Sequence, residues 1–129
     1  MSAFILDASG LLAMLREEPG GDKVAEALGD ARMSVVNYAE VVSHFIHNGM
    51  PSHEVDDMLH PLPISLVPAD PDTARLAGHL RALTADVGLS LGDRFCLALA
   101  SIENVPAWTS DRQWSAVAEK VGVEVVAIR

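Results

Sequence analysis

Four carboxylate side chains stand in apolar surroundings in this sequence, although an ionised acid is costly to bury. They occur in the segments FILDA, YAEVV, LGDRF and WTSDR, as Asp7, Glu40, Asp93 and Asp111. A desolvated carboxylate needs a hydrogen bond, an opposite charge or a metal ion. Small residues adjoin these acids and leave room for a ligand; they are Ala8, Ser9, Ala39, Gly92 and Ser110.

Four converging carboxylates repel one another, by about 1 kcal/mol per close pair in bulk water and by more near protein. A hard dication such as Mg²⁺ or Mn²⁺ removes this repulsion, because it prefers oxygen ligands and keeps several waters. Such an ion suits phosphodiester hydrolysis, since it polarises phosphoryl oxygens and lowers the pKa of a bound water. No Ser, Cys or Lys nucleophile is then needed, and the sequence shows no convincing catalytic triad.

Each acid also has a purely structural explanation. The pairs Asn37–Glu40 and Ser90–Asp93 have the three-residue spacing of a capping box. The other two acids are placed to be N-caps, and the helix dipole favours acids at helix N-termini. For any single acid the structural explanation is the stronger one. The occurrence of four acids in apolar contexts favours a shared site.

The elements that must position these acids alternate between strands and helices. The apolar runs predict strands at 3–6, 33–36, 64–67, 107–110 and 123–128. Helical periodicity predicts helices at 9–17, 23–28, 38–49, 53–59, 71–83, 91–103 and 112–121. The predicted N-caps of the later helices are Asp22, Asn37, Ser52, Asp70 before Pro71, Ser90 and Asp111.

This alternation predicts an α/β fold. We expect one domain over residues 1–129, with a mainly parallel central sheet of about five strands and helices on both faces. In such folds, sites form beyond the carboxyl ends of the strands, at a switch point in strand order. Asp7 ends the first predicted strand and Asp111 follows the fourth, while Glu40 and Asp93 lie in the first turns of helices. All four are therefore candidates for one rim of the sheet.

Composition limits the kind of protein. Half of the residues are hydrophobic and the formal net charge is −9, which disfavours nucleic-acid binding unless a bound cation reverses the local sign. Cys96, the single cysteine, lies in an apolar helical run and is interpreted as a buried side chain. No apolar run reaches the roughly 20 residues of a membrane span, and the N-terminus lacks a basic signal region. The single cysteine excludes an internal disulfide and fits a reducing setting, so we expect a cytoplasmic protein.

Four segments in order carry a family resemblance: FILDASGLLA, NYAEV, GLSLGDRFCLALA and AWTSDRQW. Together they resemble a PIN domain, and most closely the VapC-type ribonuclease toxins of bacterial toxin–antitoxin pairs. The resemblance covers essentially the whole chain. It implies a Mg²⁺- or Mn²⁺-dependent endoribonuclease that hydrolyses single-stranded or looped RNA. It also implies a homodimer or larger toxin–antitoxin complex, inhibited by a cognate antitoxin whose C-terminal segment lies over the active groove.

The resemblance also implies roles for single residues. Asp7 and Asp93 correspond to direct or water-mediated metal ligands. Glu40 corresponds to a residue that binds metal or positions the attacking water, and Asp111 to one that completes the cluster through water. Two small hydroxyl side chains match positions that orient ligands or water, and these are Ser9 and Thr109.

Basic and histidine side chains have weaker functional interpretations. Arg94 and Arg112 each follow a candidate acid and are candidates for contacts to phosphate or to an acidic antitoxin tail, with a solvated surface position as the alternative. Three other arginines are candidates for an RNA path, although ordinary surface charge is favoured; they are Arg16, Arg75 and Arg81. Glu40, His44 and His47 share a helical face, but no fourth zinc ligand is evident.

Two other functions remain open at this point. The first is a PIN fold that only binds RNA or a partner protein, since small differences in geometry decide catalysis. The second is a receiver-like signalling module with Asp7 or a neighbouring residue as the phosphoacceptor. The receiver fits poorly, because the third predicted strand ends in SLVPADPD and Lys120 lies in a predicted helix.

Overall fold

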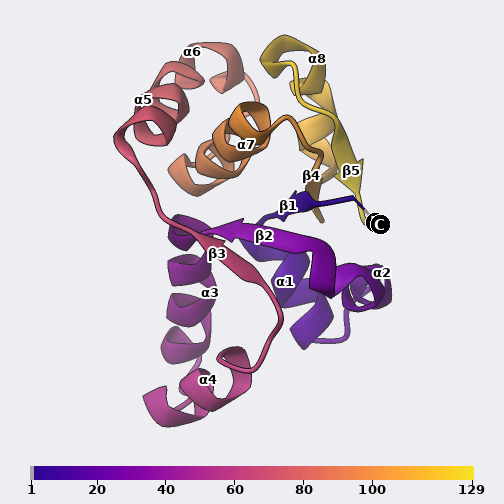
Figure 1. The fold of residues 1–129 in the computed structure, drawn as a ribbon, viewed down its shortest axis with the longest axis vertical. Coiled ribbons are helices and arrows are strands. Elements are labelled where there is room, and N and C mark those ends of the chain that lie inside the picture. The colour runs from indigo at the N-terminus through magenta and orange to yellow at the C-terminus, as the bar shows by residue number, and fades with distance from the viewer. Residues whose placement is uncertain (1) are drawn as a thin grey trace.

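The structure, a computed structural model, describes residues 2–129. Five short strands form one sheet in the order β3-β2-β1-β4-β5, and every neighbouring pair is parallel (Figure 1). The strands are β1 (Phe4–Leu6), β2 (Ala31–Ser34), β3 (Ser65–Val67), β4 (Ala107–Thr109) and β5 (Val125–Ala127). The predicted α/β class, with a mainly parallel sheet of about five strands, is confirmed.

Helices cover both faces of this sheet. In Figure 1, α1 to α4 lie below the sheet and α5 to α8 lie above it. Their bounds are α1 (Ala8–Leu15), α2 (Gly21–Ala27), α3 (Val35–His47), α4 (Ser52–Leu59), α5 (Pro71–His79), α6 (Arg81–Thr84), α7 (Leu91–Glu103) and α8 (Ala118–Val121). Two 3-10 turns accompany them, η1 (Leu28–Asp30) and η2 (Arg112–Ala116).

The central strand β1 is buried on both faces. Ile5 belongs to the core beneath α5 and α7, whereas Phe4 and Leu6 belong to the core shared with α1 to α4. This burial explains the continuous apolar run that precedes Asp7, because a parallel strand between two helical layers has no polar face. Pairing of Leu6 with Trp108 brings the carboxyl ends of β1 and β4 together.

The strand order excludes the receiver-like alternative. Receiver-type sheets have the order 2-1-3-4-5, in which the first strand lies between the second and third. Here β1 lies between β2 and β4, and β3 is an edge strand. The edge position of β3 is therefore incompatible with a receiver-type sheet, and the receiver-like alternative is excluded.

The boundary between β2 and α3 differs from its prediction. The strand is Ala31–Ser34 instead of 33–36, and α3 begins at Val35 with Ser34 as its N-cap. The Ser34 hydroxyl accepts a hydrogen bond from Val36 N at 3.2 Å, so capping overrides the strand preference of the two valines. Asn37 is consequently inside the helix and not its cap, and Glu40 lies in the second helical turn.

Several other helix ends also differ. The cap of α2 is Gly20 in the left-handed region, not Asp22, and α4 starts after Pro51 without a side-chain cap. The helix predicted at 71–83 breaks at Leu80 into α5 and α6, where the Thr84 hydroxyl binds the Leu80 carbonyl. The helix predicted at 112–121 is split into η2 and α8.

Other predictions about local structure are confirmed. Asp70 caps α5 with Pro71 at the first helical position, and Ser90 with Asp93 forms a complete capping box on α7. Cys96 is fully buried. Trp108 on β4 is half-buried and stacks on Phe4. Within residues 2–129 no helix combines the length and apolar character that crossing a membrane requires.

Candidate active site

Asp7 lies at the carboxyl end of β1, where the central strand turns into α1. It is the N-cap of α1, and its Oδ1 accepts a hydrogen bond from Gly10 N at 2.7 Å. Only 3% of the residue is exposed. The structural explanation of Asp7 as an N-cap is therefore correct, but the cap is buried far more deeply than capping requires.

Two hydroxyl groups complete the surroundings of the Asp7 carboxylate. Thr109 at the end of β4 donates from Oγ1 to Oδ2 of Asp7 at 2.7 Å, and Ser9 donates from Oγ at 2.9 Å. Ser110 N donates to the Ser9 hydroxyl at 3.1 Å, and Asp111 N donates to Thr109 Oγ1 at 3.0 Å. The chain after β4 is thus tied to the chain after β1 through Asp7 and its two hydroxyl partners.

Burial dominates the electrostatics of Asp7. Desolvation raises the pKa of this carboxyl from 3.8 to about 7, even though hydrogen bonds from Thr109, Gly10 and Ser9 lower the pKa. The negative charge of Asp93 raises the pKa further. Near neutral pH the group is therefore close to half protonated, and a nearby cation would favour its ionised form.

Asp93 lies in the first turn of α7. Its Oδ2 accepts a hydrogen bond from Ser90 N at 2.9 Å, and Asp93 N donates to the Ser90 hydroxyl at 3.1 Å. The capping-box explanation is correct for this residue. The carboxylate is nevertheless half-buried and close enough to Asp7 to influence its ionisation.

Glu40 reaches the same region from α3. The residue is exposed, and its carboxylate lies against Gly92, the residue before Asp93. Asn37 Nδ2 donates to Glu40 Oε1 at 2.9 Å and to the Gly92 carbonyl at 3.0 Å. Asn37 and Gly92 were not among the predicted site residues. The N-x-x-E spacing was a usable signal for Asn37, but it was interpreted as a capping box.

The buried thiol of Cys96 lies within the electrostatic influence of three of the four acids. Burial raises the pKa of Cys96 well above its ordinary value of 9.0. The charges of Asp7, Asp93 and Glu40 raise this pKa further, in that order of influence. The acids that follow β1 and lie on α3 and α7 are therefore near enough to Cys96 for their charges to act on its thiol.

Asp111 occupies a separate position on this rim. It is the N-cap of η2, where its Oδ1 accepts a hydrogen bond from Gln113 N at 2.9 Å. Its backbone, but not its carboxylate, is bonded to the Asp7 network through Thr109. Within residues 2–129, no three side chains of the His, Cys, Asp and Glu types are close enough, as placed, to hold one metal ion.

The two arginines next to candidate acids have different surroundings. Arg94 is 7% exposed and donates from Nη1 to the Ala77 carbonyl at 2.9 Å, so the solvated alternative was wrong for it. Its burial between α7 and α5 also removes it from a position that meets phosphate at the surface. Arg112 is exposed, and its Nε donates to the carbonyl of Arg129 at 2.9 Å.

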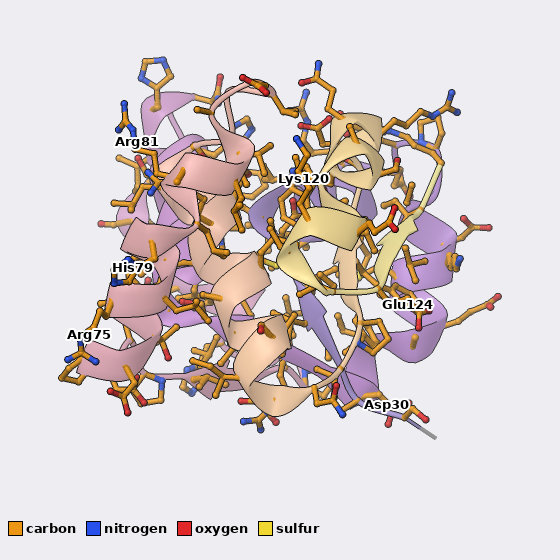
Figure 2. The ribbon with its side chains drawn as sticks, turned by 90° about the horizontal axis from the view of Figure 1, so that it is seen from above. Asp30, Arg75, His79, Arg81, Lys120 and Glu124 are labelled. Atoms are coloured by element: carbon orange, nitrogen blue, oxygen red, sulfur yellow. The ribbon has the colours of Figure 1, made fainter. Side chains whose placement is uncertain are left out.

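The other basic candidates lie at the surface. Arg75 and Arg81 project outward at one edge of the molecule, with His79 between them (Figure 2). Arg75 pairs with exposed Asp72 at 2.9 Å. Arg16 forms an ion pair with Glu18 and a hydrogen bond with His44. His44 is one of the residues that share the helical face with Glu40 and His47, so one of these histidines already has a partner.

The candidate acids thus lie along the rim of a parallel sheet, at the switch point in its strand order. The family model of the PIN domain matches residues 4–120. The chain belongs to the PIN-domain family. Ribonuclease VapC of Mycolicibacterium smegmatis (strain ATCC 700084 / mc(2)155) is 34% identical over 118 residues, which cover 79% of this chain and 86% of that protein. The chain is thus a homologue of ribonuclease VapC with a PIN nuclease domain, as the resemblance of its motifs predicted.

Solved structures share the fold over its whole length. A toxin–antitoxin complex from Klebsiella pneumoniae aligns with a TM-score of 0.74 and 18% identity, over 99% of this chain and 98% of that one. A DNA-bound VapBC from Salmonella typhimurium aligns with a TM-score of 0.75 and 13% identity over the whole of both chains. At these identities the likeness establishes the arrangement of strands and helices.

Proposed function

We propose that this protein is a Mg²⁺- or Mn²⁺-dependent endoribonuclease and the toxin component of a toxin–antitoxin pair. The main support is Asp7, a buried carboxylate with a pKa of about 7, which three hydrogen bonds orient at the carboxyl end of the central strand. Nucleases of this family typically depend on metal ions. The available donors are oxygens, which suit a hard dication, because Cys96 is buried and holds its proton.

The acids fit such an ion without forming a closed cage. Mg²⁺ keeps several waters and is bound by one or two carboxylates together with substrate phosphate oxygens. Asp7 and Asp93 are the proposed direct or water-mediated ligands, with Glu40 beside them and Asp111 acting through water. When bound, the ion polarises a phosphoryl oxygen and lowers the pKa of an attacking water.

The chain's own residues have distinct tasks in this proposal. Gly10 N, Ser9 and Thr109 hold the Asp7 carboxylate in one orientation, so that its charge is preorganised. Glu40 is solvent-exposed and therefore able to orient a water and accept its proton. Asp93 adds negative charge beside Asp7 while its amide is held by Ser90.

Cleavage of a labelled single-stranded RNA tests this function. The native protein should cut the RNA with Mg²⁺ or Mn²⁺ and lose activity in a chelator, whereas Asp7→Asn and Asp93→Asn should lose most of it. Asp56→Asn, at an exposed position on α4, is the matched control and should retain full activity. Equal cleavage by all four proteins would reject the assignment.

The same assay separates the non-catalytic alternative. That alternative is favoured by the absence, within residues 2–129, of three acids placed around one point of coordination. A protein that retains RNA without cutting it under any divalent ion would support a binding module.

An antitoxin partner and a homodimer or larger complex belong to the proposal. The Klebsiella pneumoniae structure is described as a toxin–antitoxin complex, and the Salmonella typhimurium structure as a VapBC. Co-expression with a cognate antitoxin should yield a stable complex in which RNA cleavage is suppressed. Separate elution of the two proteins would contradict the pairing.

A further inference from the structure

Glu40 differs from Asp7 in how it is held. It is an exposed residue with a long side chain on a helix that belongs to the opposite layer from α7. An unrestrained glutamate of this kind samples several rotamers, which weakens any role that needs a fixed position. Its carboxylate is nevertheless found against Gly92 and in a hydrogen bond with Asn37.

We propose that Asn37 and Gly92 are positioning residues that hold the Glu40 carboxylate beside Asp93. This inference rests on the proposed function, because it assigns them to the same metal-dependent site. Neither residue touches the reacting atoms. Asn37 restrains the Glu40 carboxylate by a hydrogen bond, and Gly92 leaves free the space that the carboxylate occupies.

Gly92 contributes by lacking a side chain. A Cβ at this position would collide with both carboxylate oxygens of Glu40 and with the carbon that joins them. The backbone does not require glycine here, since Gly92 is not among the positive-φ residues of the chain. The contact with Glu40, and not the backbone conformation, therefore accounts for a glycine in the first turn of α7.

Asn37 contributes one amide group that joins the two helices. Its Nδ2 donates both to Glu40 Oε1 on its own helix and to the Gly92 carbonyl on α7. The residue is 1% exposed, and its Oδ1 has no hydrogen-bond partner within residues 2–129. A buried polar atom without a partner is destabilising, which argues that the position is kept for the two bonds of Nδ2.

The arrangement leaves Glu40 able to act. A carboxylate has about four lone-pair sites, so the bond from Asn37 leaves capacity for a water or an ion. Outer residues that orient a ligand typically change metal affinity or activity by 10–100-fold when they are mutated. We expect an effect of that size at both positions.

A purely structural link between α3 and α7 is the competing explanation, and Gly92→Ala separates the two. The new methyl group meets the far end of a flexible, exposed side chain, so Glu40 swings away and folding is preserved. Mn²⁺ binding measured by calorimetry should weaken 10–100-fold relative to the native protein. The melting temperature without metal should match or exceed that of the native protein.

Gly78→Ala is the matched control, because Gly78 also lies in a helix and a Cβ there meets nothing within 4 Å. It should leave Mn²⁺ binding unchanged. If the native protein binds Mn²⁺ and the Gly92→Ala and Gly78→Ala variants bind it with equal affinity, the inference is overturned while the proposed function stands. A native protein that neither binds Mn²⁺ nor cuts RNA would overturn the proposed function itself.

A double-variant cycle completes the test. In a Glu40→Ala background, Gly92→Ala should cause no further loss of Mn²⁺ affinity, because the group it displaces is gone. Asn37→Ala should weaken Mn²⁺ binding in the native background but not in the Glu40→Ala background. The positioning role would be contradicted if the loss of Mn²⁺ affinity from Gly92→Ala, or from Asn37→Ala, simply added to the loss from Glu40→Ala. It would also be contradicted if Gly92→Ala destabilised the fold and Glu40→Ala did not relieve that loss of stability.

Discussion

Asp7→Asn should make the metal-free protein more stable at neutral and alkaline pH. The native carboxyl has a pKa of about 7, against 3.8 as its ordinary value. This difference of about 3 pKa units corresponds to about 4 kcal/mol of folding free energy. Asparagine has nearly the same shape, accepts the bond from Gly10 N as an N-cap, and carries no charge to desolvate.

The sign of the pH dependence follows from proton binding. Between pH 4 and pH 7 the unfolded chain has released the Asp7 proton, whereas the folded chain still holds it. The stability of the native protein therefore falls as pH rises through this window and levels off above pH 7. The advantage of Asp7→Asn should accordingly grow from near zero at pH 4 to about 4 kcal/mol at pH 8.

Urea unfolding in a chelator at pH 4.5, 6, 7 and 8 measures this difference, with Asp56→Asn as an exposed control. Saturating Mn²⁺ should stabilise the native protein but not Asp7→Asn. The difference in unfolding free energy between the two proteins at pH 8 should therefore shrink or change sign. Binding of Mn²⁺ near pH 6 should also release a proton. A difference between native and Asp7→Asn that does not change with pH would refute the reasoning, because it would show that Asp7 is not protonated in the folded state.

Thr109, Arg94 and Cys96 each lie near Asp7 or Asp93 along the chain or in space, and each has an expected experimental outcome. Thr109→Val removes the hydroxyl that donates to Asp7 and accepts from Asp111 N. It should lower the free energy of unfolding by about 1–3 kcal/mol, measured in urea at pH 8. An unchanged free energy of unfolding would show that water replaces both hydrogen bonds. Arg94→Met should keep RNA cleavage within a few-fold of native, because Arg94 is buried against Ala77; a loss of cleavage without a loss of stability would give it a direct role. Cys96 should resist alkylation at pH 8 until the protein unfolds, as followed by intact mass, and rapid labelling of the folded protein would contradict its burial.

The sequence was informative where local chemistry decides the structure. The strand before Asp7, the cap at Asp70 and the capping box of Ser90 with Asp93 were all predicted, since each depends on neighbouring residues. The PIN resemblance was carried by such short segments, and it is confirmed by the family match. The fold class followed from the alternation of apolar periods.

Features that depend on contacts between distant segments were not predicted. The two valines after Ser34 favoured a strand, but pairing with β1 and β3 ends β2 at Ser34. Asn37 was expected at a helix end, and only the packing of α3 against α7 gives it the Gly92 carbonyl as a partner. Arg94 was expected to meet solvent or phosphate, yet α5 covers it.

The capping explanation and the metal-site explanation of the acids are compatible, and Asp70 shows how they differ. Asp70 and Asp7 are both N-caps that accept a hydrogen bond from a backbone N–H three residues on. The hydrogen bonds of exposed Asp70 lower its pKa, which is the effect expected of a carboxylate cap. Burial raises the pKa of Asp7 instead, so this cap opposes folding at neutral pH when no cation is near. A carboxylate that only capped α1 would be more stable exposed or replaced by Ser or Asn. The proposed metal site would account for a buried acid at this position, because a bound cation requires the ionised carboxylate.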